Sequence, residues 1–437
     1  MSQDGDDLGF VVEIPWINPD DLAENIAYNY HQNWVFLYSS LVDFQEYKSY
    51  IAIFPEQKYC GDNFEELTNI VQNSKNKMWF GGLNYELCSN FENFNFSNKK
   101  YISLPLIFFS SYKLILEFNH KTQKLKAFTK NNEYINLVLN YKKNNKNNLA
   151  KIIVDKIYSN FTDSTYIESI KSIKENIANG DFFQANLTRK FYGDLNLAPN
   201  NLQSFLFFKE LCKVSPANYS SYFAFDNNFI ISSSPELFLK KSHDVIMSRP
   251  IKGSIQRGKD AIEDENLKNY LQNSPKELAE NLMIVDLARN DFGRFCEIDN
   301  VKVNKLFSLN SYSTIHHLSS EISGKIAKNF SIFDAIKFCF PPASMTGAPK
   351  IKVIETLYEI EKIHRGIYSG ALGYIGNDEL NLAVVIRTLI ISNNKFEFQV
   401  GGGITFDSNE EEELDEIYVK AKAIAKILGI ENFFRKH

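Results

Sequence analysis

The sequence predicts an α+β fold from three observations. Short apolar runs broken by Pro, Asn and Gly fill the chain up to about residue 130, as in a series of β-strands. Two hairpin-like segments lie within residues 220–253, and apolar residues recur at helical spacing in stretches that begin near residues 163, 275 and 409. Strands and helices grouped in this way are typical of an α+β arrangement.

The composition narrows the class of protein. With 437 residues, 44% of them hydrophobic, the chain is long enough for one large core or two domains. A formal net charge of -5 leaves no basic excess to neutralise a nucleic-acid backbone. Five Cys residues, without C-x-x-C spacing, argue against a disulfide framework or a zinc site. The acidic start of the chain and the lack of an apolar run that could span a bilayer favour a cytoplasmic protein without a membrane anchor.

The first region is predicted to extend to about residue 150. Strands are expected at the runs WVFLYSS, YIAIFP and YKLILEF. The Asn- and Lys-rich stretch 131–148 is expected to be a surface connection whose middle can form a helical turn. We therefore place a boundary between an N-terminal region, 1–150, and a catalytic region, 151–437.

The second region is predicted to open with a helix and a strand. In YIESIKSIKENIANG the apolar side chains of Ile167, Ile170, Ile173 and Ile177 recur at helical spacing, and Gly180 provides a stop. The stretch QANLTRKFYG that follows has the pattern of a strand.

The segment SRPIKGSIQRG, at residues 248–258, contains a candidate nucleophile. Lys252 lies in a glycine-flanked turn rich in fixed cations, a setting in which an amine can be held neutral. The stretch before it predicts hairpins with turns at DNN and KSHD. If the second hairpin folds about residues 242 and 243, Glu236 faces Arg249 and lies near Lys252, as an acid beside a nucleophile. The alternative is a surface lysine that lies near a strand-end glutamate and has no catalytic role.

A helix is predicted in SPKELAENLMIVDLARND. Ser274 can cap it with Pro275 at its first position, and Glu277 has the spacing of a capping box. Glu277 and Glu280 are three residues apart and so share one face. The alternative is that Glu277 serves only the cap.

The C-terminal helix DSNEEEELDEIYVKAKAIAKIL carries a second acidic pair. Ser408 is the expected cap, and Glu413, Glu416 and Lys420 line the edge of the apolar face. Two E-x-x-E pairs on separate helices can supply oxygen ligands to Mg2+. The alternative is a solvated helix start, in which residues 410–413 only complement the helix dipole. The buried stripe is expected to comprise Leu414, Ile417, Ala421, Ile424 and Leu428.

Two loops offer backbone donors for an anionic ligand. The loop FPPASMTGAPK lacks the P-loop spacing, but it carries the hydroxyls of Ser344 and Thr346 ahead of a predicted helix and so can hold a carboxylate. The run VGGGITFDS is expected to follow the strand KFEFQ and to permit close approach of a ligand. A glycine-rich bulge that serves only the fold is the alternative.

Three basic side chains complete the candidates. Arg387, inside an apolar run, needs an anion partner if it is buried, either a structural carboxylate or a substrate. His316 and His317 are neighbours in a predicted strand and are expected to point to opposite faces. A metal ion shared by the two is therefore not expected.

Taken in order, the motifs resemble those of the chorismate-utilising enzymes. They are SSSPELF, RPIKGS, AENLMIVDLARND, STIHHL, ASMTGAPK, RGIYSGALGYIG, AVVIRT, GGGI and ELDEIYVKAKA, within residues 162–428. The earlier WFGGLNYEL looks like the N-terminal part of the same family. The resemblance implies antiparallel β-sheets packed together with helices outside, as in the large component of anthranilate synthase.

Two positions imply a branch of the family. Anthranilate synthases usually have alanine at the place of Lys252, whereas aminodeoxychorismate synthases have lysine. Isochorismate and salicylate synthases have a water-activating lysine at the place of Gln184. The resemblance therefore implies that chorismate is aminated at ring carbon 4 to give 4-amino-4-deoxychorismate, a precursor of p-aminobenzoate and folate.

The resemblance also implies a route and a partner for this amination. Lys252 would add to the ring, Glu236 would protonate the departing hydroxyl, and ammonia from a separate glutamine amidotransferase subunit would then displace the lysine. The alternatives are an anthranilate synthase large component and a catalytically silent subunit that binds chorismate or tryptophan for regulation.

The remaining site residues are assigned by the same resemblance. Glu280 and Glu416 would hold Mg2+, with Glu277 and Glu413 supporting it through water. The enolpyruvyl carboxylate of chorismate would be held by Tyr368, Arg387, Gly401 and Gly403, and its ring would contact His317, Thr346 and Lys420.

Overall fold

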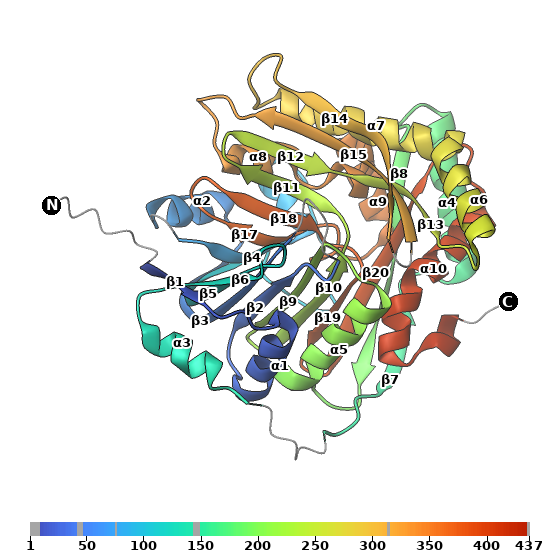
Figure 1. Ribbon diagram of the computed structural model, residues 1–437. Helices are drawn as coiled ribbons and strands as arrows, with labels where there is room; N and C mark the ends of the chain where they lie inside the picture. Colours follow the sequence, from blue (N-terminus) through green and yellow to red (C-terminus); the bar gives the residue numbers. More distant parts are fainter. Residues whose placement is uncertain (1–8, 42–46, 75–76, 143–148, 313–314, 435–437) are drawn as a thin grey trace.

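The computed structural model describes residues 9–41, 47–74, 77–142, 149–312 and 315–434 (Figure 1). Within these ranges twenty β-strands form one hydrogen-bonded network, and their pairings are antiparallel. Short apolar segments such as Trp79–Leu83 form the strands, whereas segments with helical spacing of apolar residues form the helices that cover them.

The three strands predicted before residue 150 are present, as parts of β2 (Trp34–Tyr38), β3 (Lys48–Gly61) and β5 (Ile107–Asn119), and further strands and helices lie between and around them. The other strands are β1 (Phe10–Ile14), β4 (Trp79–Leu83) and β6 (Lys124–Thr129). The helices are α1 (Pro19–Asn29), α2 (Phe64–Asn73) and α3 (Asn132–Leu139). The stretch 131–148 thus contains a helix of eight residues, and its residues 143–148 lie outside the described ranges.

The rest of the chain contributes the other strands and helices. The strands are β7 (Val154–Ser159), β8 (Gln184–Leu195), β9 (Tyr219–Phe225), β10 (Asn228–Ser234), β11 (Leu237–Ser242), β12 (Val245–Arg249), β13 (Ile251–Gln256), β14 (Lys302–Ser311), β15 (Ile315–Lys325), β16 (Gly347–Ala348), β17 (Ala371–Ile375), β18 (Leu380–Val384), β19 (Thr388–Ser392) and β20 (Lys395–Ile404). The helices are α4 (Asp163–Ala178), α5 (Asn201–Val214), α6 (Ala261–Asn273), α7 (Pro275–Gly293), α8 (Ile332–Cys339), α9 (Lys350–Glu361) and α10 (Glu410–Leu428).

The pairings arrange most strands in two runs that meet at β5. One run has the order β7, β8, β20, β19, β10, β9, β2, β3, β5. The other has the order β15, β12, β11, β18, β17, β4, β5. The β2–β9 and β4–β17 pairings join strands from before residue 150 to strands after it. The division of the chain into two regions at this residue stays a prediction.

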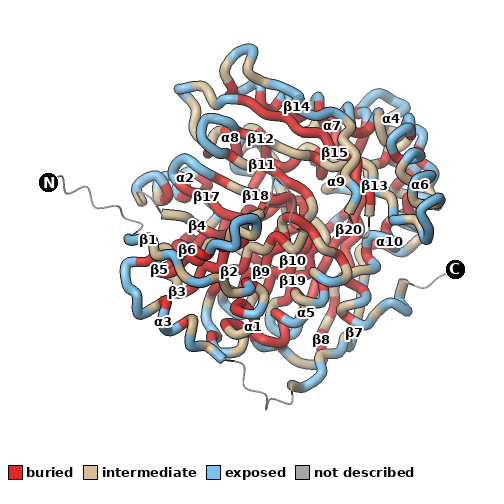
Figure 2. Tube along the Cα trace, viewed as in Figure 1, coloured by how far each residue is buried: buried red, intermediate tan, exposed pale blue. Residues whose placement is uncertain are grey.

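Three apolar clusters hold these layers together. One lies between the two runs, with buried side chains such as Ile115 of β5, Ile230 of β10 and Leu372 of β17. A second packs the first run against α1, α4, α5 and α10, and a third packs the other run against α2, α7 and α8. Figure 2 shows buried strands in the middle and exposed helical surfaces outside. The predicted α+β class, with antiparallel sheets packed together and helices outside, is confirmed.

The helix ends that carry the acidic pairs differ from the prediction in part. Ser274 accepts a hydrogen bond from the Glu277 N–H at 3.4 Å, as predicted for α7. The cap of α10 is Asn409, not Ser408, because the Ser408 hydroxyl is bonded to the Glu413 carboxylate at 2.7 Å and to the Thr405 N–H. The predicted apolar stripe of α10 is buried: Leu414, Ile417, Ala421, Ile424 and Leu428.

The two predicted hairpins are present. The β9–β10 turn falls at Asp226 and Asn227, both with positive φ. The β11–β12 turn falls at His243 and Asp244, one residue later than predicted. The register shifts after Leu237, and Leu237 is the residue that lies opposite Arg249. Among the described helices, none is long and apolar enough to cross a membrane.

Candidate active site

Lys252 lies at an irregularity in β13. The pairing of β13 with β15 shifts register between Ile251 and Ser254, so that Lys252 and Gly253 occupy a bulge, and Gly253 has a φ of +90°. A bulge turns a side chain out of the regular alternation of a strand. Here it directs the Lys252 amine toward β20, where Nζ lies 3.0 Å from the point that a Cβ on Gly403 would occupy.

Gly403 allows several polar groups to meet at one point. A Cβ at this position would lie 3.2 Å from Glu280 Oε2 and closer still to the Gln184 amide nitrogen, in addition to its contact with Lys252. Gln184 also donates a hydrogen bond to Glu280 Oε2 at 3.4 Å. The glycine run follows the predicted strand KFEFQ and continues it, because Gly401–Gly403 are part of β20 and pair with β8. The absence of side chains there leaves room for the lysine and the carboxylate.

Glu236 is a buried carboxyl directly before β11. Its side chain accepts hydrogen bonds from the Ser344 hydroxyl and from the backbone of Ile251. Burial raises the pKa of Glu236 to about 7, although Ser344, Lys252 and Arg387 act in the opposite direction. A carboxyl with this pKa holds its proton in part at neutral pH and can act as a general acid.

The charges around Lys252 are carboxylates, and the predicted cationic surroundings are wrong. Arg249 is paired with Glu321 at 3.4 Å, and Arg257 with Asp264 at 2.7 Å, so these guanidinium groups are bound elsewhere. The positive charge of Lys252 lowers the pKa values of nearby acidic groups, which are Glu236, Glu277, Glu280 and Glu416. Lys252 is therefore close enough to four carboxyl groups to act on their charges.

The glutamates of α7 and α10 face the same region. Glu277 Oε2 lies 2.8 Å from where a Cβ of Gly253 would be, and Glu413 Oε2 lies 3.1 Å from the corresponding point on Gly402. Burial raises the pKa of Glu280 to about 7, and the nearby Glu277 charge adds to the effect. The pKa of Glu277 is raised by burial and then by Glu416. The four carboxylates therefore repel one another at neutral pH.

Two lysines partly balance this negative charge. Lys276 forms an ion pair with Glu413 at 3.0 Å. Lys420 is paired with Glu416 and donates to the Gly401 carbonyl at 2.7 Å. The charge of Lys420 lowers the pKa of Glu416. Lys420 thus links α10 to β20. Lys276 was not predicted as a site residue. Its place beside Glu277 was the only signal in the sequence.

The donor set fits a magnesium ion. In the part of the chain that the structure describes, no three His, Cys, Asp or Glu side chains converge closely enough to form a preassembled metal site. Mg2+, however, uses one or two carboxylates and fills its other positions with waters or substrate oxygens. The raised pKa values of Glu277 and Glu280 mark a surplus of negative charge that a divalent cation would offset.

Arg387 is a cation that forms no ion pair with a carboxylate among the described residues. It lies between β18 and β19 with a φ of +50°, a left-handed backbone conformation that is uncommon for a residue with a side chain. Burial lowers its pKa to about 10, although the Glu236 charge raises it. Among the described residues no ion pair involves Arg387, and its Nη1 donates only a long 3.5 Å bond to Ser215. Such a guanidinium is available to an anionic ligand.

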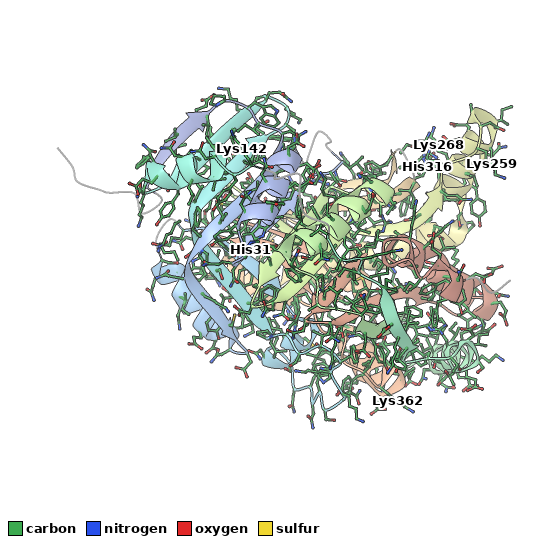
Figure 3. All side chains as sticks on the ribbon, turned by 90° about the horizontal axis from the view of Figure 1, so that it is seen from below. His31, Lys142, Lys259, Lys268, His316 and Lys362 are labelled. Atoms are coloured by element: carbon green, nitrogen blue, oxygen red, sulfur yellow. The ribbon has the colours of Figure 1, made fainter. Side chains whose placement is uncertain are left out.

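The two histidines point to different partners, as predicted. His317 Nδ1 lies 2.6 Å from the Ser254 hydroxyl, and burial, followed by the charge of Arg387, holds the pKa of His317 well below its usual range. His316 contacts Ser311 and the Asp264 carboxylate of α6. Figure 3 shows His316 beside Lys259 and Lys268, on the α6 side of the molecule. His317 is therefore the neutral histidine on the side of Arg387.

Tyr368 and Thr346 are buried near Glu236. Burial raises the pKa of Tyr368, and the Glu236 charge contributes. The Thr346 hydroxyl donates to the Ala343 carbonyl at 3.3 Å, and the Thr346 carbonyl accepts from the Asn186 N–H at 2.8 Å. The Ser344 hydroxyl, which was predicted to be open to a ligand, is bonded to Glu236 instead.

Arg365 is a positioning residue that the sequence prediction missed. Its guanidinium donates to the Met345 and Asn186 carbonyls, both at 2.8 Å, and to both oxygens of Glu361 at 2.7 and 2.9 Å. Met345 precedes Thr346, and Asn186 pairs with Gly403. The only signal in the sequence was the spacing of four residues between Glu361 and Arg365, which favours an ion pair.

Comparison with known proteins gives concordant matches. A family model described as chorismate binding enzyme matches residues 27–426. Anthranilate synthase component 1 of Lactococcus lactis is 31% identical over 347 residues, which cover 75% of this chain and 74% of that protein. Aminodeoxychorismate synthase component 1 of Bacillus subtilis is 35% identical over 271 residues, which cover 62% of this chain and 57% of that protein.

Two further matches extend this likeness. A probable anthranilate synthase component 1 of Schizosaccharomyces pombe is 38% identical over 267 residues, 61% of this chain, and the match spans about half of that protein, 54%. The crystal structure of anthranilate synthase component I from Streptococcus pneumoniae superposes with a TM-score of 0.77 at 26% identity, covering 87% of this chain and 93% of that one.

Proposed function

The chain belongs to the chorismate-binding enzymes, and on that premise we propose that it is the large component of an aminodeoxychorismate synthase, which converts chorismate and ammonia to 4-amino-4-deoxychorismate. The observation that carries this proposal is the bulge that directs the Lys252 amine beside Glu280, with Glu236 in the same charge environment. The B. subtilis relative named aminodeoxychorismate synthase component 1 supports the same choice.

Chorismate carries two carboxylates, and the site offers a separate partner for each. Arg387 has no carboxylate partner among the described residues and would hold the enolpyruvyl carboxylate, with Tyr368 and the β20 glycines beside it. Mg2+, held by Glu280 and Glu416 with Glu277 and Glu413 supporting it through water, would bind the ring carboxylate and stabilise charge on it.

The proposed reaction uses two covalent steps. The neutral Lys252 amine forms a bond to ring carbon 2, the ring double bonds shift, and the 4-hydroxyl leaves with the bonding electrons as Glu236 donates a proton to it, so that water is released. Ammonia then bonds to carbon 4 while the bond between carbon 2 and Lys252 breaks. The Glu236 carboxylate accepts a proton from the new ammonium group and returns to its acid form.

Ammonia is proposed to come from a glutamine amidotransferase subunit. The names of the relatives as component 1 support a second component. Free ammonium replaces such a subunit in a test of the isolated chain, because ammonia is the species that reacts.

The main alternative is an anthranilate synthase large component. The relatives from L. lactis and S. pombe carry that name, and the S. pneumoniae structure shares the fold. The proposed route through Lys252 argues against this alternative, because this route adds ammonia at carbon 4 and not at carbon 2. A catalytically silent regulatory subunit is disfavoured because both acidic pairs, Glu236 and Lys252 are present together.

The deciding experiment is product identification by chromatography and mass spectrometry. Purified protein is incubated with chorismate, Mg2+ and ammonium, as wild type, as Lys252→Ala and as Lys268→Ala, a matched loss of a lysine on α6 that is paired with Glu265. We expect aminodeoxychorismate from the wild type and from Lys268→Ala, and a steep loss with Lys252→Ala that an external amine restores in part. Accumulation of anthranilate, or an unchanged rate in Lys252→Ala, would overturn the proposal.

A further inference from the structure

Two side chains on one face of β8 carry buried amide groups that are incompletely hydrogen-bonded. Asn186 is 5% exposed, and its Nδ2 has no acceptor in the structure. Gln184 is 1% exposed, and its Oε1 has no donor. Buried polar atoms are rarely left in this state, because the loss of hydration is then not compensated. The two residues are two positions apart in the strand, so both side chains point to the same face, where a polar ligand can satisfy them.

The glycines of β20 lie directly beside these amides. Asn186 pairs with Gly403 in the ladder between β8 and β20. A Cβ on Gly401 would lie 3.2 Å from Asn186 Nδ2, and a Cβ on Gly403 would lie even closer to the Gln184 amide nitrogen. Because neither glycine has a side chain, a ligand can approach the backbone here. The proposed function places the enolpyruvyl carboxylate of chorismate at these two glycines.

The backbone of Asn186 is bonded on both sides, in contrast to its side-chain nitrogen. Its N–H donates to the Thr346 carbonyl at 2.8 Å, and its carbonyl accepts from Arg365 Nη2 at 2.8 Å. These two bonds fix the strand at this point, so the side-chain donor is held in place before a ligand arrives. The fold therefore satisfies the backbone of Asn186 and leaves only Nδ2 without a partner.

Arg387 lies at the same end of the sheet, next to the other edge of β20. In the antiparallel pairing of β19 with β20, Leu389 is opposite Phe398. The residues before Leu389 and those after Phe398 therefore extend toward the same end of this ladder. Arg387 and Gly401 both lie at that end. A group bound at Gly401 is therefore between the strand that carries Asn186 and the segment that carries Arg387.

The kind of atom that is unsatisfied decides the kind of ligand group. Asn186 Nδ2 is a donor and needs an acceptor oxygen. Arg387 is a second donor that forms no ion pair with a carboxylate among the described residues, and its Nη1 makes only a long 3.5 Å bond to Ser215. One carboxylate has about four acceptor positions on its two oxygens, which is enough for both side chains.

We propose that the Asn186 amide donates a hydrogen bond to the same substrate carboxylate as Arg387, the enolpyruvyl carboxylate of chorismate. Asn186 is then a further substrate-binding residue, contributed by β8. The inference rests on the proposed function for chorismate as the ligand, and it holds for either product, aminodeoxychorismate or anthranilate.

The test is isothermal titration calorimetry with chorismate and Mg2+ in the absence of ammonium, which makes the result independent of the product. We expect Asn186→Leu to weaken chorismate binding by about tenfold or more, the usual effect of losing one hydrogen bond to a charged group. With ammonium present, kcat for chorismate consumption should stay within about threefold of the wild type, because this bond is made equally in the ground state and the transition state.

The melting temperature separates a binding role from a structural one. Asn186→Leu should raise the melting temperature of the ligand-free protein, because it removes a buried donor that has no acceptor. Asn186→Ala removes the same donor without added bulk and should weaken chorismate binding to a similar extent. A residue that serves only the fold would give the opposite pattern, a lower melting temperature and an unchanged affinity.

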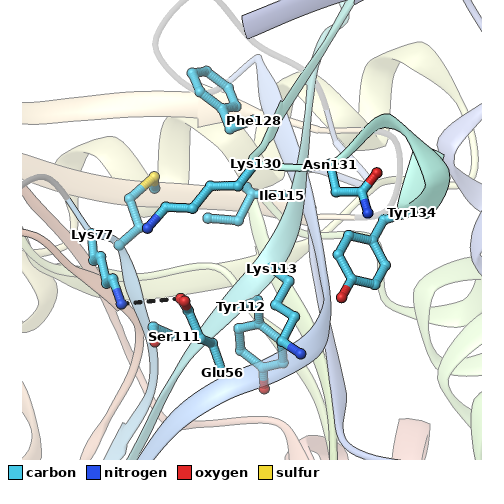
Figure 4. A pocket seen from close by; sticks show the side chains of 11 residues that line it. Glu56, Lys77, Ser111, Tyr112, Lys113, Ile115, Phe128, Lys130, Asn131 and Tyr134 are labelled. Atoms are coloured by element: carbon cyan, nitrogen blue, oxygen red, sulfur yellow. Dashed lines mark ion pairs between the residues drawn. The ribbon is translucent and has the colours of Figure 1, made fainter. Parts of the chain in front are cut away.

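Asn131→Ala is the matched control. Asn131 caps α3 and lines a cavity on β3 and β5 that shares no residue with the proposed active site (Figure 4). Both ends of its amide are bonded, since Oδ1 accepts from the Glu133 N–H at 2.8 Å and Nδ2 donates to the Glu133 carboxylate at 3.0 Å. The loss of this cap should lower the melting temperature and leave the affinity for chorismate unchanged.

A double-mutant cycle identifies the carboxylate. If Asn186 and Arg387 hold the same group, the loss of affinity in Asn186→Leu/Arg387→Gln should be smaller than the product of the two single losses, because the second substitution acts on a group that is already poorly held. Single losses that simply multiply would mean that the two side chains bind different groups, and this would overturn the proposal.

Two further results would overturn it. One is a wild-type affinity for chorismate in both Asn186 variants, and the other is a lower melting temperature of ligand-free Asn186→Leu. Formation of anthranilate by the wild type would overturn the proposed function alone, since the affinities would still decide the role of Asn186.

Discussion

The carboxyl groups of Glu236 and Glu280 lie in the interior, and the charge of Lys252 acts on both. Burial raises both pKa values to about 7, and the neighbouring lysine charge does not cancel this effect. Each group has an ordinary value of 4.5, so the folded protein holds protons at these positions that the unfolded chain releases. Burial is thus the common cause of the raised pKa in the acid proposed to protonate the departing hydroxyl and in a proposed magnesium ligand.

The stability of the metal-free protein should fall as the pH rises from about 5 to 7. The folded pKa values of Glu236 and Glu280 exceed the unfolded ones, so the folded state binds more protons in this window, and stability is lost at about 1.4 kcal/mol per pH unit for each fully titrating group. Denaturant unfolding with a chelator present measures this slope. Glu236→Gln and Glu280→Gln should each flatten it, whereas a slope identical to the wild type in both variants would contradict the assignment.

Glu236→Gln should also slow the reaction. An amide cannot donate the proton that the departing hydroxyl requires, so kcat should fall by about 10²- to 10⁴-fold. The wild-type kcat should decline as the pH rises through about 7, the pKa of Glu236, because the acid form is lost. Steady-state kinetics over this pH range give both results, and retention of the pH limb in the variant would assign it to another group.

Arg387→Gln should raise KM for chorismate. A charged hydrogen bond to a carboxylate contributes about 1.5–3 kcal/mol, which corresponds to about 10- to 150-fold in KM. Arg289→Gln, which removes an arginine paired with Asp286 on the surface of α7, is the matched control. A KM that is unchanged in Arg387→Gln would mean that the guanidinium does not hold the substrate.

The sequence identified most of these residues by type and spacing, but not their environments. Lys252, Glu236 and the two glutamate pairs were predicted, and the structure brings them together. The cationic setting of Lys252 was predicted wrongly, because Arg249 is bound by Glu321, 72 residues away in the chain, and Arg257 by Asp264 in the helix that follows. The Glu361–Arg365 pair was missed because its targets are backbone carbonyls, which leave no trace in a pattern of side chains.

At the scale of single elements, β20 shapes the site through glycines, which have no side chains, and β13 shapes it through a bulge. The glycine run in β20 gives up side-chain packing so that Lys252, Glu280 and the Gln184 amide can approach its backbone. The bulge in β13 supplies the lysine. The pattern predicted the start of β20, at KFEFQ, but it placed Lys252 in a turn, whereas the structure places it in the strand β13. A register shift depends on the partner strand β15 and could not be predicted from β13 alone.

Gly403→Ala should abolish activity and leave the fold intact. The new methyl group would lie 3.0 Å from Lys252 Nζ and 3.2 Å from Glu280 Oε2, so both side chains must move. Gly293→Ala at the end of α7 meets no heavy atom within 4 Å and should keep full activity. Turnover and circular dichroism of the two variants provide the comparison, and an active Gly403→Ala would show that the groups can move without cost.

Arg365→Met should destabilise the protein by about 3–5 kcal/mol, the usual loss when one partner of a buried ion pair is removed. Glu361 would then be a buried carboxylate without its cation, and the Met345 and Asn186 carbonyls would lose their donor. Arg365→Lys should restore part of the stability but not kcat, because an ammonium cannot span both carbonyls and Glu361. Equal recovery of stability and kcat would reduce Arg365 to a purely structural role.

At the scale of the whole molecule, the proposed metal ligands join two separate apolar clusters. α7 packs in the cluster beside the run that ends in β15, whereas α10 packs in the cluster beside β8 and β20. A cation held by Glu280 and Glu416 would therefore tie two helix layers together. The pattern of the sequence predicted these helices and the overall class, but the order of the strands depends on pairings between distant segments.

Mg2+ should raise the melting temperature of the wild-type protein. A ligand that binds only the folded state stabilises it by about 2.7 kcal/mol at 100 times its Kd. The shift should vanish in Glu280→Gln and persist in Glu355→Gln, an exposed change on α9. Differential scanning calorimetry with and without Mg2+ measures it, and an undiminished shift in Glu280→Gln would exclude this carboxylate as a ligand.

The pairing of β4 with β17 has a consequence for synthesis on the ribosome. β4 ends at Leu83 and its partner begins at Ala371, 288 residues later. At about 5–20 residues per second, the apolar β4 edge emerges about 15 to 60 s before its partner is made. Throughout that interval the nascent chain carries an open strand edge, which makes it a client for chaperones and a target for aggregation.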